Sequence, residues 1–140
     1  MNLRDVIPTA ENSSNFNVVP ESITEVGTTL ENLKAAVCGE TGASAKYAAC
    51  AAAAKEQGFD QIARLFEATS AAEQIHIGLE AGVISEIEPG YERPAAPEAE
   101  GIATDLNLIA GALGEIYETS DMYPAFIKKA QEEGNAKAVQ

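Results

Sequence analysis

Apolar residues recur at intervals of three and four along three stretches of this chain, which is the spacing of one face of an α-helix. No stretch alternates apolar and polar residues for long, so the pattern does not predict strands. Helices are expected over residues 28–58, 60–81 and 104–134. The chain is therefore expected to be all-α.

Capping residues mark where these helices begin and end. Residues 28–31 match a capping box, in which a threonine and a glutamate three positions later satisfy the free N–H groups of a new helix. Gly58 is a favoured C-terminal cap, and the second helix is expected to follow at once and to be closed by Gly82. A connection this short makes the first two helices an antiparallel hairpin.

Residues 82–103 cannot form a single helix, because three prolines and three glycines interrupt them. A connection of that length suits a bundle in which one long crossover joins two antiparallel helix hairpins, the ferritin-like arrangement. Residues 1–27 are polar and contain proline, so we interpret them as an N-terminal arm. Residues 28–140 are then expected to form one domain.

The composition excludes several classes of function. A net charge of −13 argues against nucleic acid or an anionic membrane surface as a partner. No segment has the length and apolarity of a membrane span, and residues 1–27 lack the apolar core of a signal peptide. The only two cysteines, Cys38 and Cys50, are too far apart along one predicted helix to bridge, which fits two thiols in a reducing cytoplasm.

Glu73 and His76, the only histidine, lie three residues apart on the second predicted helix. Ile62, Phe66 and Thr69 precede Glu73 at helical spacing, so this face is expected to be buried. A buried carboxylate without a partner is costly, and a cation or a set of hydrogen bonds should therefore accompany Glu73. Side chains at i and i+3 lie on one side of a helix and can bind the same metal ion.

The two halves of the chain form an internal repeat. Glu40 and Tyr47 on the first helix recur as Glu115 and Tyr123, and the glutamate and tyrosine are one position further apart in the second half. One residue has therefore been inserted into the third helix, where a π-bulge would accommodate it, and such bulges are frequent at functional sites. The inserted turn carries a second carboxylate, Glu118, three residues after Glu115. The carboxylates on three apolar faces together predict a shared metal centre.

These residues resemble the rubrerythrin family of ferritin-like di-iron proteins. The matching stretches lie within residues 31–40, 61–76, 114–118 and 122–126, and the likeness covers 28–140 apart from the crossover. The paired glutamates ahead of Met122-Tyr123-Pro124 are its most specific mark.

The resemblance implies a site of two iron ions, for which manganese or zinc are alternatives. It gives metal-ligand roles to five side chains, Glu40, Glu73, His76, Glu115 and Glu118. It also implies that Tyr47 and Tyr123 hydrogen-bond the ligand carboxylates and fix their orientation.

The family is associated with the reduction of hydrogen peroxide, or oxygen, at a di-iron centre, so the resemblance implies a peroxidase-type oxidoreductase. An external electron donor, such as a rubredoxin, is expected, because the chain has no C-x-x-C pair to hold a rubredoxin-type iron of its own. The alternatives are iron binding or storage without redox turnover, and a structural helical oligomer with an incomplete metal site.

The sequence departs from the family pattern in its fourth helix. If the spacing from Gly58 to Glu73 is repeated after Gly134, a second Glu-x-x-His pair would begin beyond Gln140, the last residue. The chain could be part of a longer protein, or two chains could complete the site by dimerisation or domain swapping, or the site could be partial. A short fourth helix would leave apolar stripes exposed, which favours a homo-oligomer such as a dimer.

Overall fold

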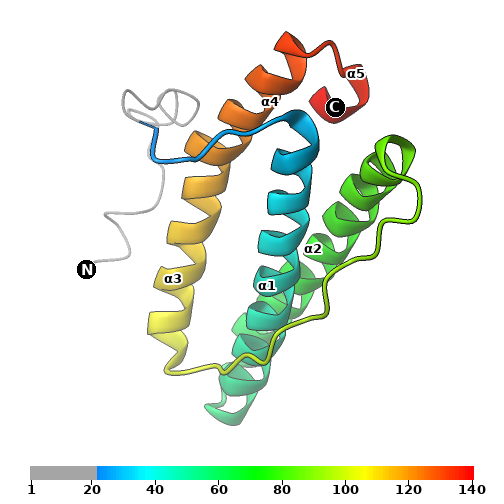
Figure 1. Cartoon of the computed structure of the whole chain (residues 1–140). Helices are drawn as coiled ribbons and strands as arrows, with labels where there is room; N and C mark the ends of the chain where they lie inside the picture. Colours follow the sequence, from blue (N-terminus) through cyan, green and yellow to red (C-terminus); the bar gives the residue numbers. More distant parts are fainter. Residues whose placement is uncertain (1–21) are drawn as a thin grey trace. The chain divides into compact units, whose positions relative to one another are not determined.

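The computed structural model describes residues 22–140, and every regular element within them is helical (Figure 1). The expected all-α fold is thus confirmed for the described residues. Within the described range no helix has the length and apolarity to cross a lipid bilayer. Of the predicted N-terminal arm, residues 22–27 contain no helix, and residues 1–21 lie outside the described part. The described residues divide into two units, which are each considered by themselves. The first is Leu30–Asn107, and the second consists of residues 22–29 and Leu108–Gln140.

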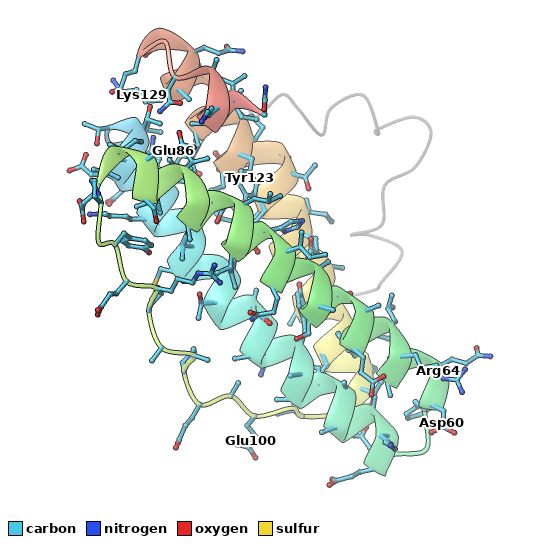
Figure 2. The ribbon with its side chains drawn as sticks, turned by 90° about the vertical axis from the view of Figure 1, so that its right-hand side faces the viewer. Asp60, Arg64, Glu86, Glu100, Tyr123 and Lys129 are labelled. Carbon is cyan, nitrogen blue, oxygen red and sulfur yellow. The ribbon has the colours of Figure 1, made fainter. Side chains whose placement is uncertain are left out.

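The first unit is built on the hairpin of α1 (Thr29–Glu56) and α2 (Asp60–Ile87), which lie side by side in both views (Figures 1 and 2). In Figure 2, Asp60 and Arg64 mark the first turn of α2, and Glu86 marks its last turn. The starts of both helices agree with the positions expected from the sequence. The two helices are antiparallel, as predicted.

Gly58 ends α1 in a Schellman turn. Its φ of +84° is in the left-handed region that favours glycine. The N–H of Gly58 donates to the carbonyl of Lys55 at 3.1 Å, and the N–H of Phe59 donates to the carbonyl of Ala54 at 2.8 Å. These two bonds satisfy carbonyls that the end of a helix otherwise leaves free. The predicted cap at Gly58 is confirmed.

The expected end of the second helix at Gly82 is wrong, because α2 continues to Ile87. Burial explains the difference: Ile77, Ala81 and Ile84 carry the buried stripe past the glycine, and Ile84 is fully buried against Val37. Burying an isoleucine side chain contributes about 1.5–3 kcal/mol. A glycine inside a helix costs only about 1 kcal/mol. The crossover therefore spans residues 88–103 rather than 82–103.

The crossover contacts α1 near both of its ends. Near its start, Lys34 forms an ion pair with Glu88 at 2.7 Å. Near its end, the backbone passes so close to α1 that a Cβ on Gly101 would lie 2.5 Å from the carbonyl oxygen of Ala49. The side chain of Gln57 accepts the N–H of Thr104 at 2.9 Å and so caps the next helix.

The predicted third helix is present, but it consists of three consecutive segments. They are α3 (Thr104–Tyr117), the π-helix η3 (Glu118–Met122) and α4 (Tyr123–Glu132). The N–H of Tyr123 donates to the carbonyl of Glu118, five residues earlier, which is the bond that defines a π-turn. The π-bulge expected from the one-residue insertion is therefore confirmed.

A second Schellman turn at Gly134 repeats the first. Gly134 has a φ of +72°, and its N–H donates to the carbonyl of Gln131 at 3.1 Å. The N–H of Asn135 donates to the carbonyl of Ala130 at 2.9 Å. The short helix α5 (Ala136–Val139) follows directly, as α2 follows Gly58. The internal repeat thus extends to the backbone of the turns, and the last helix is short as predicted.

Candidate metal centre

Glu40, Glu73 and His76 come together within the α1–α2 hairpin. One ligand atom from each of the three side chains lies within 4.8 Å of the other two, and no other such group of three occurs among residues 22–140. Glu40 comes from the first half of α1, and Glu73 with His76 comes from the middle of α2. The antiparallel packing of the two helices brings together residues that are distant in the sequence.

The carboxylates are buried, whereas the imidazole faces solvent on one side. Glu40 is 1% exposed and Glu73 is 2% exposed. The side chain of His76 is 52% exposed, so the expectation of a wholly buried face holds for Glu73 but not for the histidine. The reason is helical geometry: three residues correspond to about 300° of rotation, which places His76 about 60° away from Glu73 around α2.

The imidazole contacts both carboxylates through one atom. His76 Nδ1 lies 2.9 Å from Glu73 Oε2 and 3.5 Å from Glu40 Oε1. A carboxylate oxygen accepts hydrogen bonds, so this arrangement assigns a hydrogen to Nδ1. Two carboxylates and one imidazole that converge in this way form a donor set suited to a divalent iron, manganese or zinc ion.

Tyr47 lies two turns after Glu40 on α1 and is 7% exposed. Its ring stacks on Phe66 of α2, with ring centroids 5.9 Å apart and an interplanar angle of 25°. This contact helps to hold the two helices together two turns away from Glu40. Packing is thus one established role of Tyr47, and its predicted hydrogen bond to a ligand stays a prediction.

The other predicted site residues belong to the second unit. Glu115 is exposed on α3, and Glu118 is half-buried as the first residue of η3. Tyr123 is half-buried at the start of α4. The described structure brings Glu40, Glu73 and His76 into one group, and it does not include Glu115 or Glu118 in that group.

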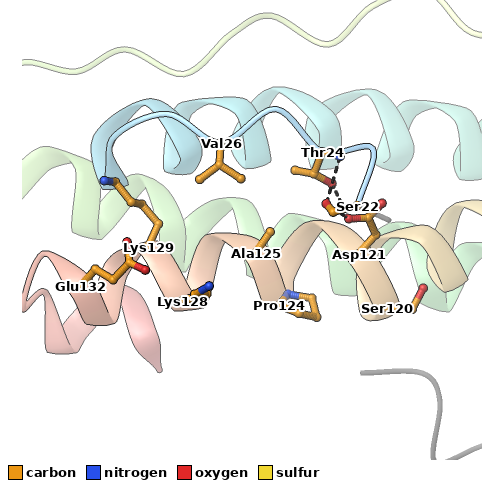
Figure 3. A pocket seen from close by; sticks show the side chains of 10 residues that line it. All are labelled: Ser22, Thr24, Val26, Ser120, Asp121, Pro124, Ala125, Lys128, Lys129 and Glu132. Atoms are coloured by element: carbon orange, nitrogen blue, oxygen red, sulfur yellow. Dashed lines mark hydrogen bonds between the residues drawn. The ribbon is translucent and has the colours of Figure 1, made fainter. Parts of the chain in front are cut away.

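Asp121, which the sequence analysis did not single out, is the buried carboxylate of the π-helix. It is 6% exposed and accepts hydrogen bonds from the hydroxyl of Ser22 and from the hydroxyl of Thr24 at 3.1 Å (Figure 3). It also accepts one from the N–H of Ile23 at 2.9 Å. These bonds, with that from Ser22 the largest cause, lower the pKa of Asp121 below its ordinary value. They attach residues 22–24 to the turn that carries Glu118.

No feature of the sequence could have paired Asp121 with its partners. The contact joins positions 99 residues apart, and aspartate beside serine is an ordinary surface combination. The only available signal was the inserted turn itself, which marks this part of the chain as unusual. Ser22, Thr24 and Asp121 also line a pocket together with Lys128 and Lys129 (Figure 3).

Comparison with known proteins gives one consistent family. Residues 31–140 match the family described as Rubrerythrin. Nigerythrin of Nitratidesulfovibrio vulgaris is 66% identical over 139 residues, which are 99% of this chain and 69% of that protein. Rubrerythrin of Porphyromonas gingivalis is 38% identical over 108 residues, covering 76% of this chain. The chain spans about half the length of that second relative, 52% of it.

Solved structures show the same similarity. A structure of nigerythrin in its partially reduced state superposes with a TM-score of 0.86 at 66% identity, covering 99% of this chain and 69% of that chain. A structure of nigerythrin in its fully reduced, all-ferrous state matches with the same TM-score of 0.86. At this level of identity the likeness extends from the fold to most of the sequence.

Replacing Asp121 with asparagine tests the attachment of residues 22–24 to the π-helix. A carboxylate whose pKa is lower in the folded protein than its ordinary value of 3.8 stabilises the folded state at pH values above 3.8. This contribution is lost as the pH falls through the lower pKa of the folded protein. We therefore expect Asp121→Asn to lower the free energy of unfolding at pH 7 and to reduce its dependence on pH below 3.8. Urea unfolding of both proteins between neutral and acid pH measures the difference.

The matched control is Glu98→Gln, which removes an exposed carboxylate in the crossover. Its unfolding curves should follow those of the parent protein at every pH. Parallel pH profiles for the parent and Asp121→Asn would show that the carboxylate does not stabilise the attachment.

Proposed function

Because the chain belongs to the rubrerythrin family of di-iron carboxylate proteins, we propose that it is an oxidoreductase that reduces hydrogen peroxide. The observation that supports this most directly is the convergence of two buried carboxylates and an imidazole within 4.8 Å of one another. Such a group is costly to maintain without a cation, since two buried negative charges repel each other in a medium of low dielectric constant.

The residues fit a metal ion at this point. In the hydrogen-bonded group, the proton on His76 Nδ1 occupies the position between the imidazole and Glu73 that a cation would take. A divalent ion in place of that proton would also have Glu40 Oε1 nearby, since this oxygen lies 3.5 Å from the same nitrogen. Ligands must be deprotonated to bind metal, so we expect binding to release protons and to strengthen as the pH rises.

Five side chains are proposed as metal ligands. They are Glu40, Glu73 and His76, which converge in the α1–α2 hairpin, and Glu115 and Glu118, which match the ligand pattern of the family. Tyr47 and Tyr123 are proposed to hydrogen-bond ligand carboxylates. Two ferrous ions, when bound, supply the two electrons that convert one hydrogen peroxide and two protons into two molecules of water.

Both hydrogen peroxide and electrons would have to reach the group formed by Glu40, Glu73 and His76 from outside the protein. The exposed side of His76 leaves a route from solvent to the carboxylates, and hydrogen peroxide is small enough to use it. One turn from the carboxylates on each helix, Val37 and Ile77 are buried in the apolar cluster of the hairpin. We propose that an external donor protein, such as a rubredoxin, returns the electrons that each turnover consumes.

The ligand assignment is tested with Glu40→Gln and His76→Ala. Each should lower the metal content of the purified protein and abolish the stabilisation that added ferrous ion gives under anaerobic conditions. For the parent protein this stabilisation should be about 2.7 kcal/mol at a free metal concentration 100 times the Kd. Elemental analysis and thermal unfolding measure the two effects.

Glu67→Gln is the matched control for this test, because Glu67 is an exposed carboxylate on the same helix, α2. It should bind metal as the parent does. If both ligand variants keep the metal content and stability of the parent, the carboxylates are not ligands, and a structural role of the helical domain is favoured instead.

The reaction is tested by mixing the anaerobic ferrous protein with hydrogen peroxide. We expect one peroxide to be consumed for every two ferrous ions oxidised, since peroxide accepts two electrons. Stopped-flow absorption and a peroxide assay give this ratio. Oxidation of a large excess of ferrous iron into a retained mineral would instead assign the protein to iron storage.

A second copy of this chain is the proposed partner of α2. Leu65, Ile75 and Leu79 are 55%, 63% and 67% exposed on this helix. Leu65, Ala72 and Leu79 follow one another at heptad spacing, so they form one stripe along α2 on the same side as the exposed part of His76. A stripe of this kind is commonly covered by another helix.

We expect the parent protein to be a dimer and Leu79→Glu to shift it toward the monomer, because the new carboxylate would be buried in the contact. Size-exclusion chromatography with light scattering measures the mass. Ile102→Glu introduces the same charge at an exposed position of the crossover and should leave the mass unchanged. A parent protein that is monomeric at all concentrations would contradict this assembly.

A further inference from the structure

Three polar side chains link α1 and α2 close to the candidate metal centre. They are Ser44 on α1, which is 4% exposed, and Ser70 and Gln74 on α2. The two serines are joined by reciprocal bonds: the Ser44 hydroxyl donates to the carbonyl of Ser70 at 3.0 Å, and the Ser70 hydroxyl donates to the carbonyl of Ser44 at 2.8 Å. Each hydroxyl has a single hydrogen, so these bonds use the donor capacity of both serines.

Gln74 completes the link. Its side-chain amide donates to the hydroxyl oxygen of Ser44 at 2.8 Å. Ser44 therefore donates to one residue of α2 and accepts from another, one turn further along that helix. An arrangement in which every hydroxyl is used in this way resists sliding better than apolar contacts do, because hydrogen bonds depend strongly on distance and angle.

Other hydroxyls of the same hairpin behave differently. Thr41, Thr69 and Ser85 each donate to the carbonyl four residues earlier on their own helix, at 2.6, 3.0 and 2.7 Å. This is the usual local bond of a serine or threonine in a helix. Ser44 and Ser70 instead bond across the interface, to the backbone of the opposite helix. Their bonds thus fix the position of one backbone against the other.

The serine pair lies one turn from the carboxylates on both helices. Glu40 lies four residues before Ser44, and Glu73 lies three residues after Ser70. Because the helices are antiparallel, the two steps lead toward the same end of the hairpin, by about 6 Å and about 4.5 Å at 1.5 Å per residue. The bonds between the serines, one turn away, thus set the position of Glu40 relative to Glu73 along the hairpin.

We propose that Ser44 and Ser70 are positioning residues, whose reciprocal bonds hold α1 and α2 in the register that brings Glu40 to metal-binding distance of Glu73 and His76. This inference rests on the proposed metal-binding function. Slipping one helix by a single residue moves its carboxylate by about 1.5 Å. Metal–ligand distances tolerate only about 0.2 Å, so even a small slip would weaken the site.

The test compares metal affinity among variants at a temperature where every protein is fully folded. The probe is cobalt(II), whose visible absorption reports the ligands around it, titrated into the metal-free protein at neutral pH. We expect Ser44→Ala and Ser70→Ala each to weaken cobalt binding about tenfold and to alter the visible spectrum. The double variant should be little weaker than either single variant, because each single change already breaks the reciprocal pair.

Ser85→Ala is the matched control, since it removes a hydroxyl from the same helix whose bond stays within that helix. It should bind cobalt as the parent does. Gln74→Ala, which leaves both serine-to-carbonyl bonds intact, should weaken binding less than either serine variant. A merely structural role for the serines would lower the melting temperature of the metal-free protein and leave the Kd of the folded protein unchanged.

The outcomes separate this inference from the proposed function. If the parent binds cobalt through His76 and the serine variants match it in Kd and spectrum, the positioning role is overturned and the metal site stands. If His76→Ala binds cobalt as well as the parent does, the metal site itself is overturned, and the positioning role with it.

Discussion

The burial of Glu40 against Glu73 is the constraint around which the α1–α2 hairpin is organised. Two carboxylates that are 1% and 2% exposed sit beside one imidazole, in a hairpin whose remaining interface is largely alanine, serine and a few larger apolar side chains. Small residues let the helices approach closely, and close approach keeps water away from the carboxylates. The same closeness makes the pair sensitive to the register of the helices, because buried side chains are closely packed.

Several features at different distances from the carboxylates set that register. The Schellman turn at Gly58 fixes where α2 starts relative to the end of α1, and the serine pair fixes the two backbones one turn from the acids. Beyond the acids, Ile84 packs against Val37, and the ion pair of Lys34 with Glu88 holds the start of the crossover. The exposed ion pair contributes little, about 0–1 kcal/mol, so the buried contacts dominate.

Periodicity and capping predicted much of this structure. The features that they did not predict depend on contacts between distant residues. Gly58 and Gly134 were predictable because a left-handed residue after a helix has few alternatives to glycine, and the offset between the repeats located the π-turn. The end of α2 was mispredicted at Gly82 because local propensity was outweighed by burial of Ile84. The bond of Asp121 to Ser22 depends on tertiary packing, which helix periodicity does not specify.

The two halves use corresponding serines differently, and the one-residue insertion lies beside the second of them. Ser120 precedes Tyr123 by the same spacing as Ser44 precedes Tyr47, so the two serines correspond and the extra residue lies between Glu115 and Ser120. Ser44 bonds across to α2, whereas Ser120 lies in the π-helix and donates to the carbonyl of Ile116 at 2.6 Å, four residues earlier in the same continuous helix. The widened turn that accommodates the insertion carries Glu118 as an additional carboxylate, which residues 41–43 of the first half do not offer. The insertion is thus one difference between the halves of a repeat whose helix-ending turns at Gly58 and Gly134 are otherwise alike.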